Sequence, residues 1–193
     1  MDATIPLLER LAALIQHAVR EDAARHGLLP IHLQVLAYLG VANRYSDLPI
    51  AVAEYFGITR GTVSQTLAVL ERRGLISKRP DARHGKRIHL ELTSAGRTVL
   101  AGSWPERLDA ALTASGVSGA GLDDSLRALL AALQHLNRNQ AFGVCHRCAH
   151  FRRDETGYHC GLTGEPLEPE QTDKVCREWT APAGDGRCVA TGA

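Results

Sequence analysis

The first 144 residues of this 193-residue chain contain no cysteine, which excludes a disulfide framework or a thiolate metal site from that part of the sequence. No apolar run approaches the roughly 20 residues that a membrane-spanning helix needs, so we expect no membrane partner. The first residues lack the basic start and the apolar core of a secretion signal, and this predicts a cytoplasmic protein. No catalytic triad, phosphate-binding loop or dinucleotide fingerprint occurs, and we therefore do not expect an enzyme.

Charge and cysteine are distributed unevenly along the chain. Overall, 45% of the residues are hydrophobic and 22% are charged, as in ordinary soluble proteins, and the net charge is only +1. Residues 1–140 nevertheless carry a basic excess of three and residues 141–193 an acidic excess of two, and all five cysteines lie at or after position 145. The sequence therefore predicts a basic domain at 1–141, a cysteine-rich segment at 142–180 and a flexible end at 181–193.

Hydrophobic periodicity predicts a mainly helical body with one small β-hairpin. Apolar residues recur at spacings of three and four in successive segments, which are residues 4–26, 30–40, 49–57, 59–73, a helix after Thr93 that Pro105 breaks or kinks, and 122–140. Ser46 and Asp47, before Pro49, give the cap and first-turn signals of the third helix, and Thr93 is expected to cap the fifth. After the fourth helix the period changes to two at residues 75–79 and 88–92, with a polar turn between them. This order is typical of a winged helix-turn-helix fold.

The segment around the hairpin carries the local excess of positive charge that duplex DNA attracts. Residues 59–92 hold eight basic and three acidic side chains, a net charge of +5. The large apolar residues of the fourth helix share one face and the opposite face is small and polar, so this helix fits the major groove. A solvated charged helix with a surface hairpin is the alternative interpretation. The positions expected to meet DNA are Arg60, Gly61, Thr62, Ser64, Gln65, Arg72, Arg83, Lys86 and Arg87.

Short stretches of the body also form a recognisable pattern: ITRGTVSQTL at 58–67, LERRGLI at 70–76, DARHGK in the wing at 81–86 and LTSAG at 92–96. Together they resemble the MarR family of transcriptional regulators, over residues 1 to about 140. The resemblance implies a homodimer, formed by the first and last helices, that binds a palindromic operator in double-stranded DNA. It also leaves room for a small-molecule ligand near the dimer interface. The wing departs from the family pattern at His84 and Lys86, where an acidic residue and an arginine are common.

Four of the five cysteines have a spacing typical of a metal centre. Cys145, Cys148, Cys160 and Cys176 form the pattern C-x2-C-x11-C-x15-C, in which the close pair lets two thiolates converge from one turn. The segment is rich in turns and poor in apolar residues, so it needs such a staple to fold. The uneven spacing favours an iron–sulfur cluster of the 4Fe-4S kind, while zinc and a metal-free thiol or disulfide switch stay open. Cys188 is expected to be a spare thiol.

The run from Cys145 to Trp179 is also weakly similar in spacing to high-potential iron–sulfur proteins. This run and those proteins share a C-x2-C pair, two later single cysteines and a tryptophan shortly after the last cysteine. We expect Phe151 and Trp179 to form a small core in this segment. The histidines beside the cysteines are expected to be neighbours of the centre rather than ligands, and these are His146, His150 and His159.

Three hypotheses about function follow. The leading one is a homodimeric DNA-binding regulator whose operator affinity is tuned by a C-terminal iron–sulfur cluster that acts as a redox or iron sensor. The second is a MarR-like regulator with a structural zinc module in its tail, which binds a protein partner while the body senses a small molecule. The third is a thiol oxidoreductase that uses Cys145 and Cys148. It is disfavoured because a thioredoxin-like C-x-x-C normally lies near a βαβ pattern, which this sequence lacks.

Overall fold

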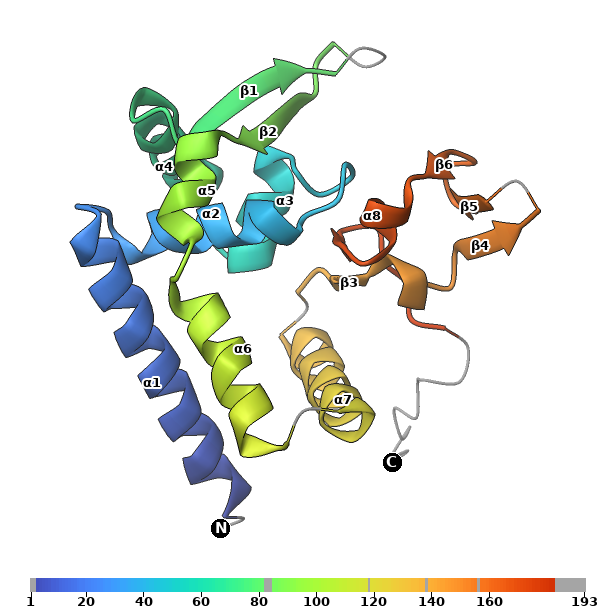
Figure 1. Ribbon diagram of the computed structural model, residues 1–193. Coiled ribbons are helices and arrows are strands. Elements are labelled where there is room, and N and C mark those ends of the chain that lie inside the picture. The colour runs from blue at the N-terminus through green and yellow to red at the C-terminus, as the bar shows by residue number, and fades with distance from the viewer. Residues whose placement is uncertain (1–2, 82–84, 118, 138, 156, 183–193) are drawn as a thin grey trace. The chain divides into compact units, whose positions relative to one another are not determined.

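The computed structural model describes residues 3–81, 85–117, 119–137, 139–155 and 157–182 (Figure 1). The body is mainly helical with one small sheet, as predicted, and its elements are α1 (Thr4–Arg25), α2 (Pro30–Val41), α3 (Pro49–Phe56), α4 (Arg60–Arg72), β1 (Ile76–Pro80), β2 (Ile88–Leu92), α5 (Ser94–Leu100), α6 (Trp104–Ser115) and α7 (Ala120–Leu136). The C-terminal segment consists of shorter pieces, which are β3 (Gly143–Val144), η1 (Cys145–Arg147), β4 (Phe151–Asp154), β5 (Gly157–Cys160), β6 (Pro166–Leu167), α8 (Pro169–Thr172) and β7 (Val175–Cys176). Among the described residues, no helix is long and apolar enough to cross a membrane.

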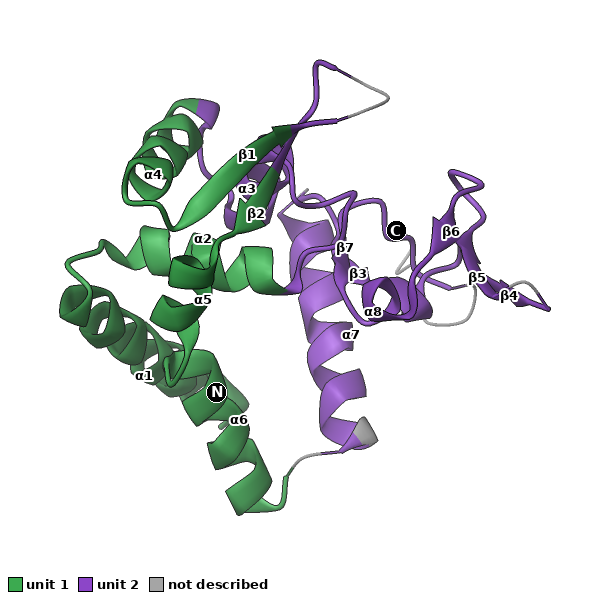
Figure 2. Cartoon of the chain, turned by 45° about the horizontal axis from the view of Figure 1, so that its top comes forward, with its two compact units in different colours: residues 1–40, 61–79, 90–118 green, residues 41–60, 80–89, 119–193 purple. Residues whose placement is uncertain are grey.

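The chain divides into two compact units that do not follow its order (Figure 2). The first unit consists of residues 1–40, 61–79 and 90–118. The second consists of residues 41–60, 80–89 and 119–193. The cysteine-rich segment therefore shares a unit with α3, with the loop before α3 and with the turn of the β1–β2 hairpin.

The core of the first unit is built from the inward faces of α2 and α4. Leu33 and Leu36 of α2 and Leu70 of α4 have no exposed surface. Apolar residues spaced by three and four fall on one side of a helix, and burying each such side chain stabilises the fold by roughly 1.5–3 kcal/mol. The inward face predicted for the fourth helix, α4, which is the expected recognition helix, is thus confirmed.

Helices α1 and α6 lie side by side and are joined by a buried carboxylate (Figure 1). Asp22 of α1 is only 1% exposed, and its Oδ2 accepts a hydrogen bond of 2.7 Å from the backbone nitrogen of Trp104. Its carboxylate also pairs with the guanidinium of Arg107, at 3.1 Å, and with that of Arg25. A buried charge needs such partners, so this cluster fixes the relative position of the two helices.

Several predicted helix ends are confirmed and two are wrong. The side chain of Thr93 accepts a 3.1 Å hydrogen bond from the backbone nitrogen of Gly96, so it caps α5 as expected. The helical segment is interrupted between Leu100, the end of α5, and Trp104, the start of α6, and Pro105 lies in the first turn of α6. Ser46, however, does not cap α3 and Asp47 does not lie in its first turn, because the helix begins at Pro49 and its N-cap is Leu48, which forms no side-chain cap hydrogen bond. Likewise α7 ends at Leu136 and does not reach residue 140.

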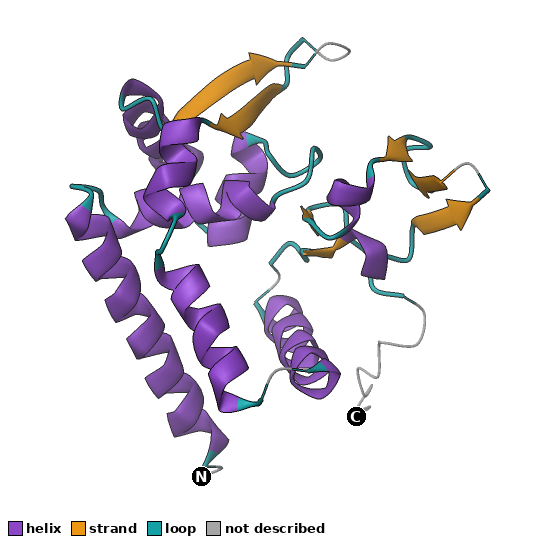
Figure 3. Ribbon diagram, in the orientation of Figure 1, coloured by secondary structure: helices purple, strands orange, loops and turns teal. Residues whose placement is uncertain are grey.

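The C-terminal segment forms two small antiparallel sheets (Figure 3). Strand β3 pairs with β7, with Gly143 opposite Cys176, and β4, β5 and β6 form the other sheet. The ring of Trp179 lies directly over Gly143, where an added Cβ would come within 2.5 Å of the ring. The indole nitrogen of Trp179 donates a 3.0 Å hydrogen bond to the carbonyl of Arg147. Glycine is therefore required at this position for the tryptophan to close over β3.

Candidate nucleic-acid interface and cysteine centre

Helix α4 presents the polar face that sequence reasoning assigned to DNA. Val63, Leu67 and Leu70 are buried, whereas the predicted contact positions on this helix are all exposed: Arg60, Gly61, Thr62, Ser64, Gln65 and Arg72. Exposed hydroxyl, amide and guanidinium groups on one face of a helix are the groups that hydrogen-bond base edges and phosphates. Contact of these residues with DNA remains a prediction.

Several basic side chains of residues 59–92 bind other groups of the protein. The guanidinium of Arg73 donates hydrogen bonds of 2.8 Å to the carbonyls of Gly27 and His26, which ties the end of α4 to the α1–α2 turn. Lys78 pairs with Glu71 at 2.6 Å, and Arg79 pairs with Glu91 at 3.0 Å. In the wing, Lys86 and Arg87 are exposed, while Arg83 and His84 lie outside the described residues.

A histidine that the sequence did not single out links the wing to the loop before α3. His89 lies on β2, with Nδ1 at 2.6 Å from Asp47 Oδ1 and Nε2 at 2.9 Å from Asp81 Oδ2. Burial alone would lower the pKa of His89, but the hydrogen bonds and charges of the two carboxylates outweigh it and raise the pKa above its ordinary value. Both ring nitrogens donate only in the protonated form, so this bridge is strongest with a charged imidazolium.

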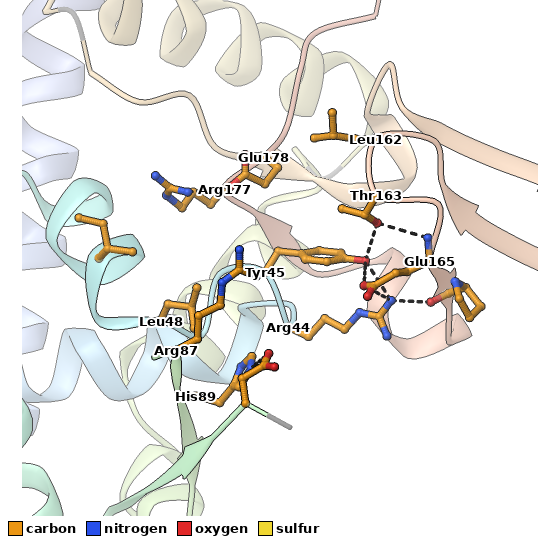
Figure 4. Close-up of a pocket in the computed structure, with 13 residues that line it drawn as sticks. Arg44, Tyr45, Leu48, Arg87, His89, Leu162, Thr163, Glu165, Arg177 and Glu178 are labelled. Atoms are coloured by element: carbon orange, nitrogen blue, oxygen red, sulfur yellow. Dashed lines mark hydrogen bonds and ion pairs between the residues drawn. The ribbon is translucent and has the colours of Figure 1, made fainter. Parts of the chain in front are cut away.

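A cavity of about 950 Å³ opens within the second unit (Figure 4). Three polar groups meet at it, two from the loop before α3 and one from the turn between β5 and β6: the Tyr45 hydroxyl donates a 2.8 Å hydrogen bond to Glu165, and Arg44 lies 3.0 Å from the same carboxylate. The cavity walls come from the loop before α3, the first turn of α3, the wing, the chain between β5 and β6 with the start of β6, and the residues after β7. They are formed by Arg44, Tyr45, Leu48, Ile50, Asp81, Arg87, His89, Leu162, Thr163, Glu165, Pro166, Arg177 and Glu178.

The four predicted ligand cysteines are gathered in the C-terminal segment. Cys145 and Cys176 are buried, each 5% exposed. Cys145 directly follows β3, and Cys176 is the last residue of β7, the strand that pairs with β3. Burial, followed by the charges of Cys176, Cys160 and Cys148, raises the pKa of Cys145 to about 12. The Cys145 thiol therefore lies within electrostatic range of the other three thiols. Among the described residues, however, no group of three or more His, Cys, Asp or Glu side chains is arranged to hold a metal ion.

Amide groups surround two of these sulfur atoms. The backbone nitrogens of His150 and Thr180 donate to Cys148 Sγ at 3.5 and 3.4 Å. Burial raises the pKa of Cys176, and the side chain of Asn43 and the backbone amide of Glu178 partly oppose that rise by hydrogen bonding. Donors of this kind stabilise an anionic sulfur more than a neutral thiol.

Two of the three neighbouring histidines have other partners. His146 lies 3.0 Å from an Asp173 carboxylate oxygen, and His159 lies 3.3 Å from Asp154. This is compatible with their expected place beside the centre. Cys188, the expected spare thiol, lies outside the described residues.

The cysteine segment is anchored to residues 42–54 of the winged-helix sequence, within the same unit. The backbone nitrogen of Asn43 donates to the carbonyl of Val175 at 2.9 Å, and the backbone nitrogen of Arg177 donates to the Ser46 hydroxyl at 2.7 Å. The guanidinium of Arg177 forms a two-point ion pair with Glu54 of α3. No local sequence pattern pointed to these residues, because their partners lie more than a hundred positions away.

The first and last helices of the body each carry apolar side chains that the single chain does not cover. On α1, Leu7 and Leu11 are 64% and 54% exposed. On α7, Leu126, Leu130 and Leu133 are 47–50% exposed. Exposed apolar rows of this kind normally meet a partner, which agrees with the dimer helices that the sequence resemblance implies.

Comparison with known proteins defines the class of the body as a winged helix-turn-helix. The MepR–DNA complex of S. aureus matches with a TM-score of 0.51 and 18% identity, covering 70% of this chain and 98% of that one. CouR from Rhodococcus jostii RHA1, bound to p-coumaroyl-CoA, matches with a TM-score of 0.51 and 21% identity, covering 70% of this chain and 92% of that one. At these identities the similarity establishes the fold.

Comparison of the sequence with protein-family models identifies a family for part of the body. Residues 26–87 match the model of the MarR family, and this confirms the predicted resemblance for α2, α3, α4, β1 and the turn of the wing. No curated protein matches the chain. The family match is confined to residues 26–87, and the solved structures establish the winged-helix fold of the body. The match ends before the cysteine segment, which must be interpreted from its own residues.

Proposed function

We propose that the protein is a sequence-specific DNA-binding transcription regulator that acts as a homodimer on a palindromic operator. The observation that carries this proposal is the exposed polar face of α4 within the segment that matches the MarR family. Gln65 and Ser64 have the groups to read base edges, and Arg72 and the wing residues Lys86 and Arg87 have the charge to bind phosphates. The uncovered apolar rows on α1 and α7 supply the dimer contacts.

DNA binding is tested by titrating a selected operator with the full-length protein at several salt concentrations. Gln65→Ala is expected to weaken binding to the selected operator by about 1–3 kcal/mol and to relax base specificity at one position of each half-site. Arg72→Ala is expected to weaken binding to all sequences and to reduce the salt dependence, because a phosphate contact releases counterions. Binding that is unchanged in both variants would contradict the proposed interface.

The second part of the proposal is that Cys145, Cys148, Cys160 and Cys176 hold an iron–sulfur cluster that tunes operator affinity. Amide donors around Cys148 and Cys176 support it, because they stabilise anionic sulfur, as does the position of Cys145 within electrostatic range of the other three thiols. A bound cluster would supply a redox-sensitive and iron-dependent group at this position. The protein's own contribution is to hold the sulfurs, to shield them with Trp179, and to connect them to α3.

The connection to α3 gives the centre a route to the DNA-binding elements. Arg177, next to Cys176, is paired with Glu54 of α3 and bonded to Ser46, so a change around the centre acts on the helix that precedes the recognition helix. In a dimer on two half-sites, a small displacement of that kind changes the fit of both recognition helices at once. DNA affinity and cluster state are then linked.

Anaerobic purification, an optical spectrum and metal analysis test the cluster directly. We expect a brown protein with broad visible absorbance and about four iron atoms per chain. Cys148→Ser should abolish the absorbance and the redox response of operator binding, whereas Cys188→Ser, the matched control, should preserve both. Operator binding that keeps its redox response in Cys148→Ser would refute the coupling.

Zinc is the second candidate for the centre, since four thiolates also form a structural zinc site. A colourless protein with one zinc per chain would favour it, and the segment would then be a static module for a protein partner. The signal would instead be a small molecule, for which the cavity beside Arg44 and Arg87 offers about 950 Å³. Loss of operator binding on adding ligand, with no response to oxidant, would distinguish this alternative.

A further inference from the structure

The charged groups on the wall of the cavity in the second unit are almost all paired with one another. Each of the three carboxylates has a basic partner on the same wall, and these pairs are Glu165 with Arg44 at 3.0 Å, Glu178 with Arg177 at 2.6 Å and Asp81 with His89 at 2.9 Å. Polar groups that already have partners need no ligand to satisfy them.

Arg87 is the exception among these charged groups. It lies on the wing, its side chain is exposed at the cavity wall, and its guanidinium has no hydrogen-bond or ion-pair partner in the part of the chain that the structure describes. The backbone of this residue is held, because its carbonyl accepts a 2.9 Å hydrogen bond from the backbone nitrogen of Asp81. The cavity wall therefore presents one full positive charge and a fork of N–H donors that an anionic ligand can use.

Apolar side chains supply the rest of a binding surface. Leu48 and Ile50 come from the end of the loop before α3 and from its first turn, whereas Leu162 and Pro166 come from the chain after β5 and from the start of β6. Leu162 is 52% exposed, so covering it with an apolar group is favourable. Figure 4 shows Arg87 and Leu162 on different sides of the cavity, whose volume of about 950 Å³ is within the range of small-molecule sites.

We propose that this cavity binds a small organic monocarboxylate with an apolar body. The carboxylate pairs with Arg87, and the apolar body covers Leu162 and the apolar residues around it. The planar fork of a guanidinium matches the two oxygens of a carboxylate and forms two parallel hydrogen bonds with them. A phosphate monoester fits less well, because its charge of about −1.5 to −2 would face the three carboxylates of the wall.

Ligand binding at Arg87 acts directly on the DNA-binding surface. Arg87 is one of the wing residues proposed to bind phosphate, and its guanidinium cannot pair fully with a carboxylate and a phosphate at once. The carboxylate therefore competes with DNA for this side chain and weakens operator binding. In this respect the inference rests on the proposed function, but it does not depend on what the four cysteines bind.

The first test measures binding of three acids to the full-length protein by calorimetry. The probes are octanoate, cyclohexylacetate and phenylbutyrate, and the primary amide of each acid is its neutral control. We expect the acid that binds most tightly to bind about 10–100-fold more tightly than its amide, because a charge-assisted hydrogen bond contributes roughly 1.5–3 kcal/mol. No binding by any of the acids, or equal affinity for acid and amide, would overturn the proposal.

Three variants locate the site. Arg87→Gln should weaken binding of the acid by about 10–100-fold and leave binding of the amide unchanged. Lys86→Gln, the matched control, removes the neighbouring exposed cation of the wing, which does not line the cavity, and should keep the wild-type affinity for the acid although it weakens DNA binding. Leu162→Ala should weaken acid and amide alike, by about 3–10-fold. Equal affinity of wild type and Arg87→Gln for the acid would show that Arg87 does not bind it.

The last test separates the ligand site from the function on which it acts. Operator binding is titrated with and without a saturating concentration of the acid, and we expect about tenfold weaker binding by the wild type and no change for Arg87→Gln. An acid that binds at Arg87 without weakening operator binding would overturn the competition. A wild-type protein that binds no operator would overturn the proposed function, while the calorimetry still decides whether the cavity binds a carboxylate.

Discussion

The helical part of the first unit and the cysteine segment of the second are held together by different forces. In the former, side chains with no exposed surface are aliphatic, and Leu33, Leu36 and Leu70 are typical. In the latter, the buried residues among those described are Phe142, Cys145, Leu167, Thr172 and Cys176. Its strands are two to four residues long and its helix α8 has four residues, lengths that are not stable on their own in water.

This difference shows where each region obtains its stability. Aliphatic burial is intrinsic to the sequence, so the helices need no ligand to pack. The cysteine segment depends instead on hydrogen bonds to residues 42–54 and, in our proposal, on a group that draws four sulfurs together. The two regions should therefore respond differently to metal removal, to truncation of a leucine and to pH.

Metal removal should have the largest effect and should divide the regions most clearly. When the loaded protein is stripped with a chelator under reducing conditions, we expect backbone amides of residues 143–180 to lose their protection from hydrogen exchange, because ligation supplies folding free energy there. Amides of α2 and α4 should keep theirs. Equal protection of the cysteine segment before and after stripping would show that it folds without a bound group.

Truncation of a core leucine should destabilise the helical part of the first unit more than truncation of a leucine destabilises the cysteine segment. Leu36→Ala is expected to lower the free energy of unfolding by about 2–5 kcal/mol, because it leaves a cavity among closely packed aliphatic side chains. Leu162→Ala, at a position 52% exposed in the cysteine segment, serves as the control and should change it by less than about 0.5 kcal/mol. Urea denaturation, monitored by the far-ultraviolet circular dichroism of the helices, measures the free energy of unfolding of both variants. Similar losses in the two variants would contradict the comparison.

The same contrast explains which features could be predicted from the sequence. The buried face of α4 was predictable because Val63, Leu67 and Leu70 repeat at helical spacing, and that face follows from local geometry alone. The grouping of the four cysteines into one centre was inferred from spacing and stays a prediction: Cys145 lies within electrostatic range of the other three thiols, but the described residues show no group arranged to hold a metal ion.

Contacts between distant parts of the chain could not be predicted in this way. Ser46 was expected to cap α3, but its hydroxyl bonds Asn43 and the backbone of Arg177, which is 131 positions away. Asp47 was expected at the first turn of α3, and its carboxylate instead binds His89. Polar side chains before a helix satisfy several partners equally well, and only the folded chain decides among them.

The smallest effect we predict concerns His89, which joins the wing to the loop before α3 by hydrogen bonds. Its carboxylate partners Asp47 and Asp81 raise its pKa, and the other titratable or charged groups around the adjoining cavity include Arg87, which stays charged at all relevant pH values. A histidine with a raised pKa contributes stability that is complete below its ordinary value of about 6.5 and is lost as pH rises through the higher folded value.

Replacing His89 by glutamine removes this titration while keeping a donor for one carboxylate. The difference in unfolding free energy between wild type and His89→Gln should be largest near pH 6, on the order of 1 kcal/mol, and should shrink as pH rises above about 6.5. Urea denaturation at a series of pH values measures it, and subtracting the variant cancels the contributions of other groups. A difference that is constant or grows with pH would mean that the histidine is neutral in the folded protein, and the bridge between wing and loop would then depend on a single hydrogen bond.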